Sequence, residues 1–210
     1  MKMLKKMLVA GCLGVPLMLA GCGDDDNKAL KVSKSTSVAA NVNTTTGVAT
    51  TTTAVAATPA NSSVVAVAIP AGSDITPPAG TKFTTTPTIV VATPVNGTTS
   101  GVPTVTINGT VFRLSESKGA VDISISGVSS FTVSAPGATV KIPVVVTTGL
   151  TDGNTAVPVT AVKSNGTTQS YLGTYDATAK TVTVNNVTNF CLFVIDGVWL
   201  STTGSPGTAT

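Results

Sequence analysis

A two-residue alternation of β-branched and polar side chains, broken at short intervals by glycine and proline, constrains this fold more than any other feature. In residues 121–126, Val, Ile and Ile alternate with Asp, Ser and Ser, which places the apolar side chains on one face of an extended strand. Residues 139–147 and 180–184 repeat the pattern. No segment after the N-terminal region shows the apolar period of an amphipathic helix. The chain is therefore predicted to be all-β.

Two Asn-Gly pairs strengthen this prediction. Asn108-Gly109 and Asn165-Gly166 each stand between two runs of β-forming residues. Both central residues of the tightest hairpin turn need positive φ, which Asn and Gly adopt most easily, so each pair predicts a β-hairpin. The remaining strand candidates are short and closely spaced: residues 64–69, 83, 88–95, 131–133, 189–195 and 198–200. Many short strands between turn signals favour an antiparallel β-sandwich.

Charge and histidine content exclude several classes of function. The chain has 12 basic and 9 acidic residues, and three of the basic ones, Lys2, Lys5 and Lys6, lie at the N-terminus. Without that N-terminal segment the remaining chain is neutral, which gives no electrostatic basis for binding nucleic acid. The chain contains no histidine, so histidine acid–base chemistry and histidine metal ligation are absent. No cofactor is expected.

The N-terminal segment has the layout of a secretory signal. The three lysines precede an apolar run over residues 7–19, which is too short to span a bilayer. Residues 1–21 are therefore predicted to be a signal peptide. The closing Leu19-Ala20-Gly21-Cys22 resembles the lipobox of bacterial lipoproteins. The resemblance implies cleavage before Cys22, a diacylglycerol on its thiol and acylation of the new amino terminus. An ordinary signal with an incidental cysteine is the alternative.

The resemblance also implies a location. Two or three acyl chains hold a protein on a membrane far more firmly than one. Gly23 follows the lipidated position, where an aspartate would imply retention in the inner membrane. We therefore expect attachment to the outer membrane of a bacterial cell envelope, with the protein periplasmic or surface-exposed. The acidic run at residues 24–26 resembles a surface-export signal, and a solvated spacer is the alternative reading.

Composition predicts how the remaining chain divides. Residues 22–62 are rich in Thr and Ala, contain no aromatic residue and show no sustained period, which is typical of a disordered linker. Residues 63–200 are predicted to form the β-sandwich region, either as one unit or as two, at about 63–118 and 119–200. Residues 201–210 are small and polar, and a flexible tail is expected there.

Several short motifs support a more specific architecture. One is Phe131-x-x-x-Ala135-Pro136 ahead of Val140-x-Ile142-Pro143, and another is Gly173-Thr174-Tyr175-Asp176 followed by Lys180-Thr181-Val182-Thr183-Val184 and Thr188-Asn189-Phe190-Cys191-x-Phe193. With these motifs, the region from 121 to 195 is similar to the Ig-like and ZU5/GAIN-like β-sandwich modules of bacterial surface proteins.

That resemblance implies one reaction to consider. Some ZU5 and GAIN relatives cut their own chain before the serine of a His-Phe-Ser segment. Carried over, the bond is Phe190–Cys191 and the nucleophile is the Cys191 thiol. Asn189 stands where the relatives have histidine, and no other histidine exists to replace it. We therefore expect Cys191 to be a small, half-buried residue of a strand that is apolar on both faces.

Other candidate sites have simpler explanations. Residues 115–118 match a Ser-x-x-Lys motif, but they lie in a turn between strands and lack its partner motifs. Residues 152–154 carry too few oxygen ligands for calcium, and a turn explains them. Tyr171, Tyr175 and Trp199 are the aromatic residues that a sugar-stacking platform would use, and core packing is the alternative use of Trp199.

These observations together predict a lipid-anchored envelope or surface protein, not an enzyme, whose β-sandwich has a binding or structural role. The expected contacts are the membrane, through Cys22, and an envelope polysaccharide or another surface protein. The alternative is an autoprocessing module that is cut at Phe190–Cys191. A hydrolase is disfavoured because the chain lacks histidine and paired carboxylates on one strand.

Overall fold

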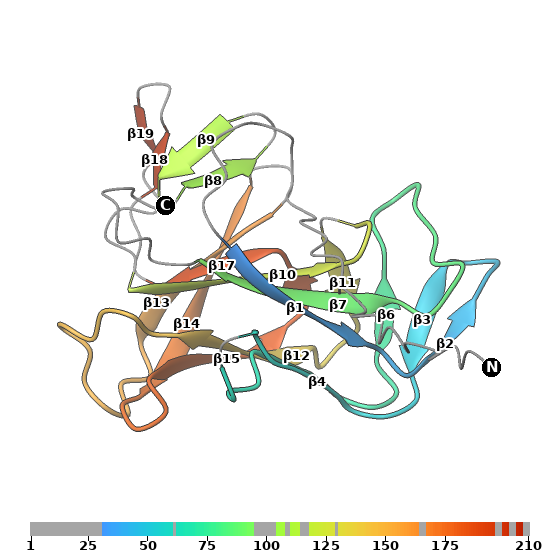
Figure 1. The fold of residues 1–210 in the computed structure, drawn as a ribbon, viewed down its shortest axis with the longest axis horizontal. Coiled ribbons are helices and arrows are strands. Elements are labelled where there is room, and N and C mark those ends of the chain that lie inside the picture. The colour runs from blue at the N-terminus through green and yellow to red at the C-terminus, as the bar shows by residue number, and fades with distance from the viewer. Residues whose placement is uncertain are drawn as a thin grey trace, which may run out of the picture.

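The regular structure of this protein is antiparallel β-sheet, as predicted (Figure 1). The structure, a computed structural model, describes residues 31–60, 62–94, 104–107, 110–113, 118–128, 130–163, 167–195, 199–201 and 205–207. Within these ranges there is no helix, and hence none that is long and apolar enough to cross a membrane.

A ten-stranded sheet forms most of the described molecule. In order across the sheet, its strands are β1 (Lys31–Ser37), β7 (Thr88–Pro94), β10 (Gly119–Ile125), β17 (Leu192–Ile195), β13 (Val157–Val162), β14 (Thr168–Asp176), β15 (Thr181–Val187), β12 (Ala138–Pro143), β5 (Val67–Ile69) and β4 (Val55–Ala57). Strands from before residue 95 therefore pair with strands from after residue 118. In this sheet, the segments on the two sides of residue 118 do not form separate units.

The ten-stranded sheet folds over at β14. Residues 168–173 of this long strand pair with β13, whereas residues 174–176 pair with β15. Gly173 stands at the corner, where a Cβ atom would collide with the side chain of Val182. The absence of a side chain lets β14 pass close to β15 and turn. The fold brings β10 and β17 over β12, which makes a two-layered sandwich (Figure 1).

The core lies between the two layers. β10 contributes Val121, Ile123 and Ile125, all at most 2 % exposed, which confirms the face predicted from the two-residue alternation. The other layer contributes Val140, Ile142, Val182 and Val184. The neighbouring strand β17 adds Phe193 and Ile195. Val146, expected on the same face as Val140, is instead exposed, because β12 ends at Pro143 and the chain leaves the sheet.

A five-stranded sheet extends the sandwich at one end (Figure 1). Its strands, in order, are β16 (Asn189–Phe190), β11 (Phe131–Val133), β6 (Asp74–Thr76), β3 (Val48–Thr51) and β2 (Ala40–Asn43). β16 and β17 are consecutive, so the chain passes from this sheet into the centre of the ten-stranded sheet across the single residue Cys191.

A four-stranded sheet contains β19 (Ser205–Gly207), β18 (Trp199–Ser201), β9 (Thr110–Arg113) and β8 (Thr104–Ile107). Ile107 pairs with Thr110, which confirms a hairpin at this place. The second predicted hairpin is confirmed by the pairing of β13 with β14. Both Asn-Gly pairs lie outside the described residues. Ser201 and Ser205–Gly207, from the predicted tail, lie in β18 and β19.

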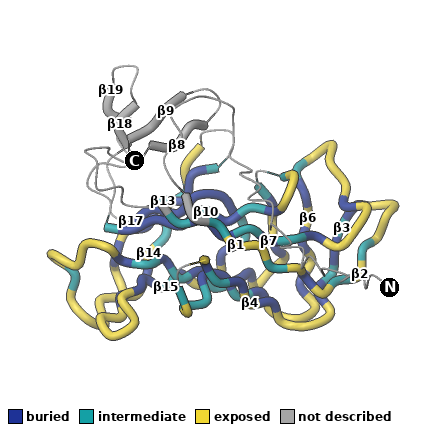
Figure 2. The backbone as a smooth tube through the Cα atoms, in the orientation of Figure 1, coloured by how far each residue is buried: buried dark blue, intermediate teal, exposed yellow. Residues whose placement is uncertain are grey.

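The prediction of a disordered linker over residues 22–62 is wrong for residues 31–60. This segment forms β1 to β4, and its apolar side chains join the core: Val38, Ala49, Val55 and Ala57 are each at most 5 % exposed. Thr51 is also buried. Its hydroxyl tolerates burial because it donates to the carbonyl of Pro70 (2.8 Å) and accepts from the backbone N–H of Ser73 (2.9 Å). The low complexity of this segment therefore includes small side chains of the core, and Figure 2 shows buried residues along β3 and β4. Residues 22–30 lie outside the described residues.

Candidate functional site

An open pocket of about 160 Å³ lies where the five-stranded sheet meets the ten-stranded sheet. We call it the β16 pocket. Its polar lining residues are Thr76, Ser130, Thr132, Lys163 and Asn189, and its apolar ones are Pro77, Pro78, Phe131 and Phe190. They come from the ends of β6 and β13 and from β11 and β16. The pocket thus exists only because segments that are far apart in the sequence pair side by side.

Local sequence explains where each wall stands. β6 ends at Thr76 because Pro77 and Pro78 lack the N–H that a sheet ladder needs. β13 ends at Val162, and the N–H of Lys163 donates to the carbonyl of Thr167 (2.9 Å) at the base of the β13–β14 hairpin. The ends of these two strands form two walls of the β16 pocket.

Two stacked phenylalanines support the pocket. Phe131 and Phe190 are directly paired across β11 and β16, with ring centroids 4.6 Å apart and ring planes 4° apart. Phe190 also meets Phe193 edge to face, at a centroid distance of 6.1 Å. The contact between Phe190 and Phe193 links the two sheets. Phe131 and Phe190 are only 2 % and 1 % exposed, so their rings present little surface to a ligand.

Short polar side chains form the rim. Thr132 pairs with Thr76 on one side and with Asn189 on the other, so these three side chains share a face of the sheet. The amide Nδ2 of Asn189 donates to Oγ1 of Thr188 (3.1 Å), which fixes its orientation. Lys163 is the charged residue of the lining, and its ammonium has no hydrogen-bond or ion-pair partner within the described ranges.

A second polar row runs beside the rim. Asp74 lies two residues before Thr76 on β6, and its Oδ1 accepts a hydrogen bond from Oγ1 of Thr50 (2.6 Å). The N–H of Asp74 donates to Oγ of Ser134 (2.9 Å). This carboxylate is therefore held by the neighbouring strand β3 and is not part of the pocket lining.

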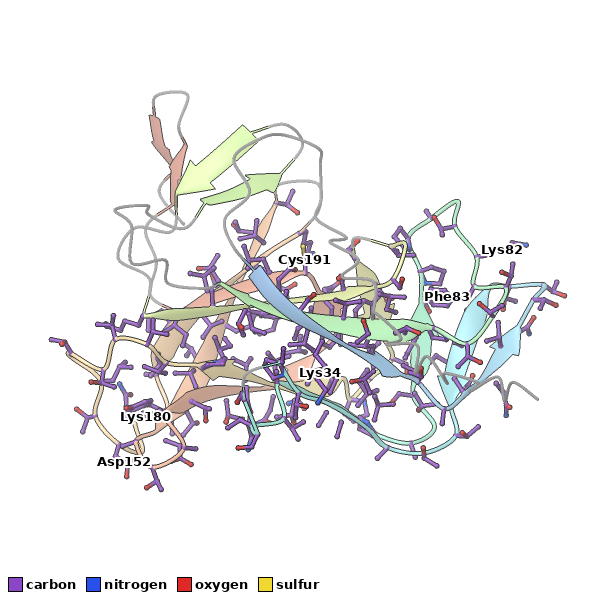
Figure 3. All side chains as sticks on the ribbon, viewed as in Figure 1. Lys34, Lys82, Phe83, Asp152, Lys180 and Cys191 are labelled. Carbon is purple, nitrogen blue, oxygen red and sulfur yellow. The ribbon has the colours of Figure 1, made fainter. Side chains whose placement is uncertain are left out.

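The Phe190–Cys191 bond lies at the bend between β16 and β17. Cys191 is 6 % exposed and belongs to an apolar cluster with Ala120, Val162, Leu192 and Val194, on the face of the sheet that points away from the main core (Figure 3). Its carbonyl accepts a hydrogen bond from the N–H of Ile123 (2.9 Å). Cys191 is thus more deeply buried than expected and lies between two strands, whereas self-cleavage at this bond stays a hypothesis.

The remaining sequence candidates either shape loops or lie outside the described residues. Oδ1 of Asp152 accepts from the N–H of Ala177 (2.8 Å), and Oδ1 of Asn154 accepts from the N–H of Ala156 (2.9 Å), so these side chains shape loops. Across the described part of the chain, no three acidic or cysteine side chains are grouped as a metal site would require. Cys22 and residues 115–117 lie outside the described residues.

The predicted aromatic platform does not form from its two tyrosines. Tyr175 is 4 % exposed and part of the core. Tyr171 is half-buried and packs against the core, with its ring 6.2 Å from that of Phe193. The side chain of Trp199 lies outside the described residues.

Sequence reasoning missed most of the β16 pocket. It singled out Asn189, Phe190 and Phe131, but not Thr76 or Lys163. The pair Pro77-Pro78 is the one local signal that a strand stops there. The pairing of β6 with β11 and of β11 with β16 is long-range, and no pattern within either segment encodes it.

Comparison of the chain with protein-family models, with curated proteins and with solved structures found no match.

Proposed function

We propose that this chain is a lipid-anchored protein of the bacterial cell envelope whose β-sandwich binds a partner through the β16 pocket without catalysing a reaction. The segment that resembles a lipobox supports the anchor at Cys22. The two-layered antiparallel architecture supports an Ig-like or ZU5/GAIN-like module of the kind carried by bacterial surface proteins. An outer-membrane location follows from Gly23 after the lipidated cysteine.

The β16 pocket is the observation that carries the binding role. It combines hydroxyl, amide and ammonium groups with apolar walls, which is the usual composition of a site that orients a small ligand group. Its partners are an envelope polysaccharide or another surface protein. Self-cleavage at Phe190–Cys191 is the alternative function, and it predicts two fragments where a binding role predicts one intact chain.

The anchor and the sandwich are close together in the chain. Eight residues separate Cys22 from Lys31, where β1 begins. Fully extended, this connection reaches about 30 Å. The sandwich itself would therefore begin near the membrane surface, in contrast to the long reach that a linker up to residue 62 would give.

Three variants test this function. Cys22→Ser should move the protein from the membrane fraction to the soluble fraction, or leave an uncut precursor; unchanged fractionation would refute the anchor. Thr132→Arg would fill the β16 pocket and should abolish retention on isolated cell-envelope material. Thr174→Arg, on an exposed position of β14, is the matched control and should bind like the wild type. Equal retention of both variants would show that binding does not use the pocket.

A further inference from the structure

We propose that the β16 pocket receives one acidic sugar residue, a pyranose that bears a carboxylate, from an envelope polysaccharide. This inference rests on the binding function proposed above and names its ligand class. Three properties of the pocket carry it: its size, its mixture of polar and apolar walls, and the sign of its charge.

The size of the pocket limits what can enter. Sites for whole small molecules are usually about 300–1,000 Å³. At about 160 Å³, the β16 pocket has room for one sugar ring or one amino-acid side chain. It is also open to solvent at the sheet edge, so the rest of a polymer would continue along the surface.

The walls match the two sides of a pyranose. Pro78, which is half-buried, offers apolar surface to the C–H groups of a sugar ring, and the buried Pro77, Phe131 and Phe190 complete the apolar part of the lining. Elsewhere in the lining, the exposed hydroxyls of Thr76 and Thr132 each provide a donor and acceptors for ring hydroxyls. A peptide side chain would leave most of these polar groups to water, and this favours a sugar.

Lys163 decides the charge of the ligand. It is the cation of the lining. Among the described residues, no carboxylate lines the pocket and the Lys163 ammonium has no partner. The hairpin contact between the N–H of Lys163 and the carbonyl of Thr167 holds its backbone at the pocket edge. Hydrogen bonds between an ammonium and a carboxylate are stronger than those between neutral groups, so an acidic sugar gains most from this position.

The test uses the mature full-length lipoprotein in detergent and three probes measured by calorimetry. The probes are oligosaccharides of galacturonate or glucuronate, neutral oligosaccharides of the same linkage, and peptides with a free C-terminal carboxylate. Lys163→Gln removes the charge and keeps a polar side chain that is shorter by one bond. Lys180→Gln is the control, because Lys180 is exposed in the turn between β14 and β15 and does not line the pocket (Figure 3).

We expect uronate oligosaccharides to bind at least about tenfold more tightly than neutral ones, the scale of one hydrogen bond to a charged group. Lys163→Gln should abolish this preference, and Lys180→Gln should keep it. Equal binding of neutral and acidic sugars, normal uronate binding by Lys163→Gln, or preferential binding of the peptides would each overturn the inference. If Thr132→Arg still abolishes envelope retention in that case, the binding function stands and only the ligand class is wrong.

Discussion

The phenol of Tyr171 is a polar group that the fold leaves poorly satisfied. Its hydroxyl is buried without a hydrogen-bond partner of acceptable geometry among the described residues. Burial raises the pKa of Tyr171 above its ordinary value of 10.0, and the nearby Gln169 side chain opposes this shift only in part. The folded state therefore favours the neutral phenol more than the unfolded state does.

Tyr171 should make the protein sensitive to alkali. Its contribution to stability is complete below pH 10, the ordinary pKa, and is lost as the pH rises through the higher pKa of the folded state. Tyr171→Phe should remove this part of the pH dependence and, at neutral pH, be neutral or stabilising by up to about 1 kcal/mol. Urea unfolding at pH 7 and at pH 11 measures both effects. A marked loss of stability at pH 7 would show that the hydroxyl has a partner.

Cys191 should be structural, and the chain should stay whole. The residue is small and lies in an apolar cluster, so Cys191→Ala should cost about 1 kcal/mol or less in the free energy of unfolding. Intact mass of the purified mature protein, with and without hydroxylamine, checks the chain itself. A fragment that begins at Cys191, absent from the alanine variant, would promote the autoprocessing alternative.

At the scale of a strand, β1 is an edge of the ten-stranded sheet, and a lysine protects it against pairing with another chain. Its residues Lys34 and Thr36 pair with Val91 and Ile89, whose side chains face the core, so a lysine occupies the inner side of the sheet edge. Nζ of Lys34 donates to Oγ1 of Thr58 (3.3 Å), just after β4, the opposite edge strand (Figure 3). An inward-pointing charge of this kind discourages pairing with a second sheet.

Lys34→Val should therefore promote self-association. The variant would replace the charge on this edge strand by an apolar β-branched side chain, and its mass by light scattering should exceed that of the wild type at equal concentration. Lys141→Val is the matched control, because Lys141 lies on β12, which has a paired neighbour on each side. Identical masses for Lys34→Val and the wild type would show that this edge is protected in another way.

Strand-scale features also show what the sequence can predict. The alternation in residues 121–126 predicted the buried face of β10 because one strand contains the whole signal. The apolar run of β17 predicted burial on both faces, and all four of its residues are buried. The strands β1 to β4 were missed because Ala49 and Ala57 fill the core with side chains too small to mark a pattern. The β16 pocket was missed because its walls meet through pairings between distant segments.

For the whole molecule, the corner at Gly173 joins the two layers. An alanine there would press its methyl group against Val182 and lie 3.3 Å from Val184. Gly173→Ala should destabilise the protein by about 1–3 kcal/mol through overpacking. The double variant Gly173→Ala/Val182→Ala should lose less stability than the sum of the two single variants, because the second change removes the colliding atoms. Strict additivity in urea unfolding would mean that the corner does not depend on this close approach.

The position of β17 has a consequence for how the protein forms. β17 stands between β10 and β13, yet it is the last strand of the ten-stranded sheet along the chain. When the chain becomes available from its N-terminus onward, β10 and β13 keep unpaired backbone groups until residues 192–195 are also available. Closure then requires contacts across about 70 residues, which makes assembly slow. Under the export proposed above, nearly all of the chain would cross the membrane before the sheet becomes complete.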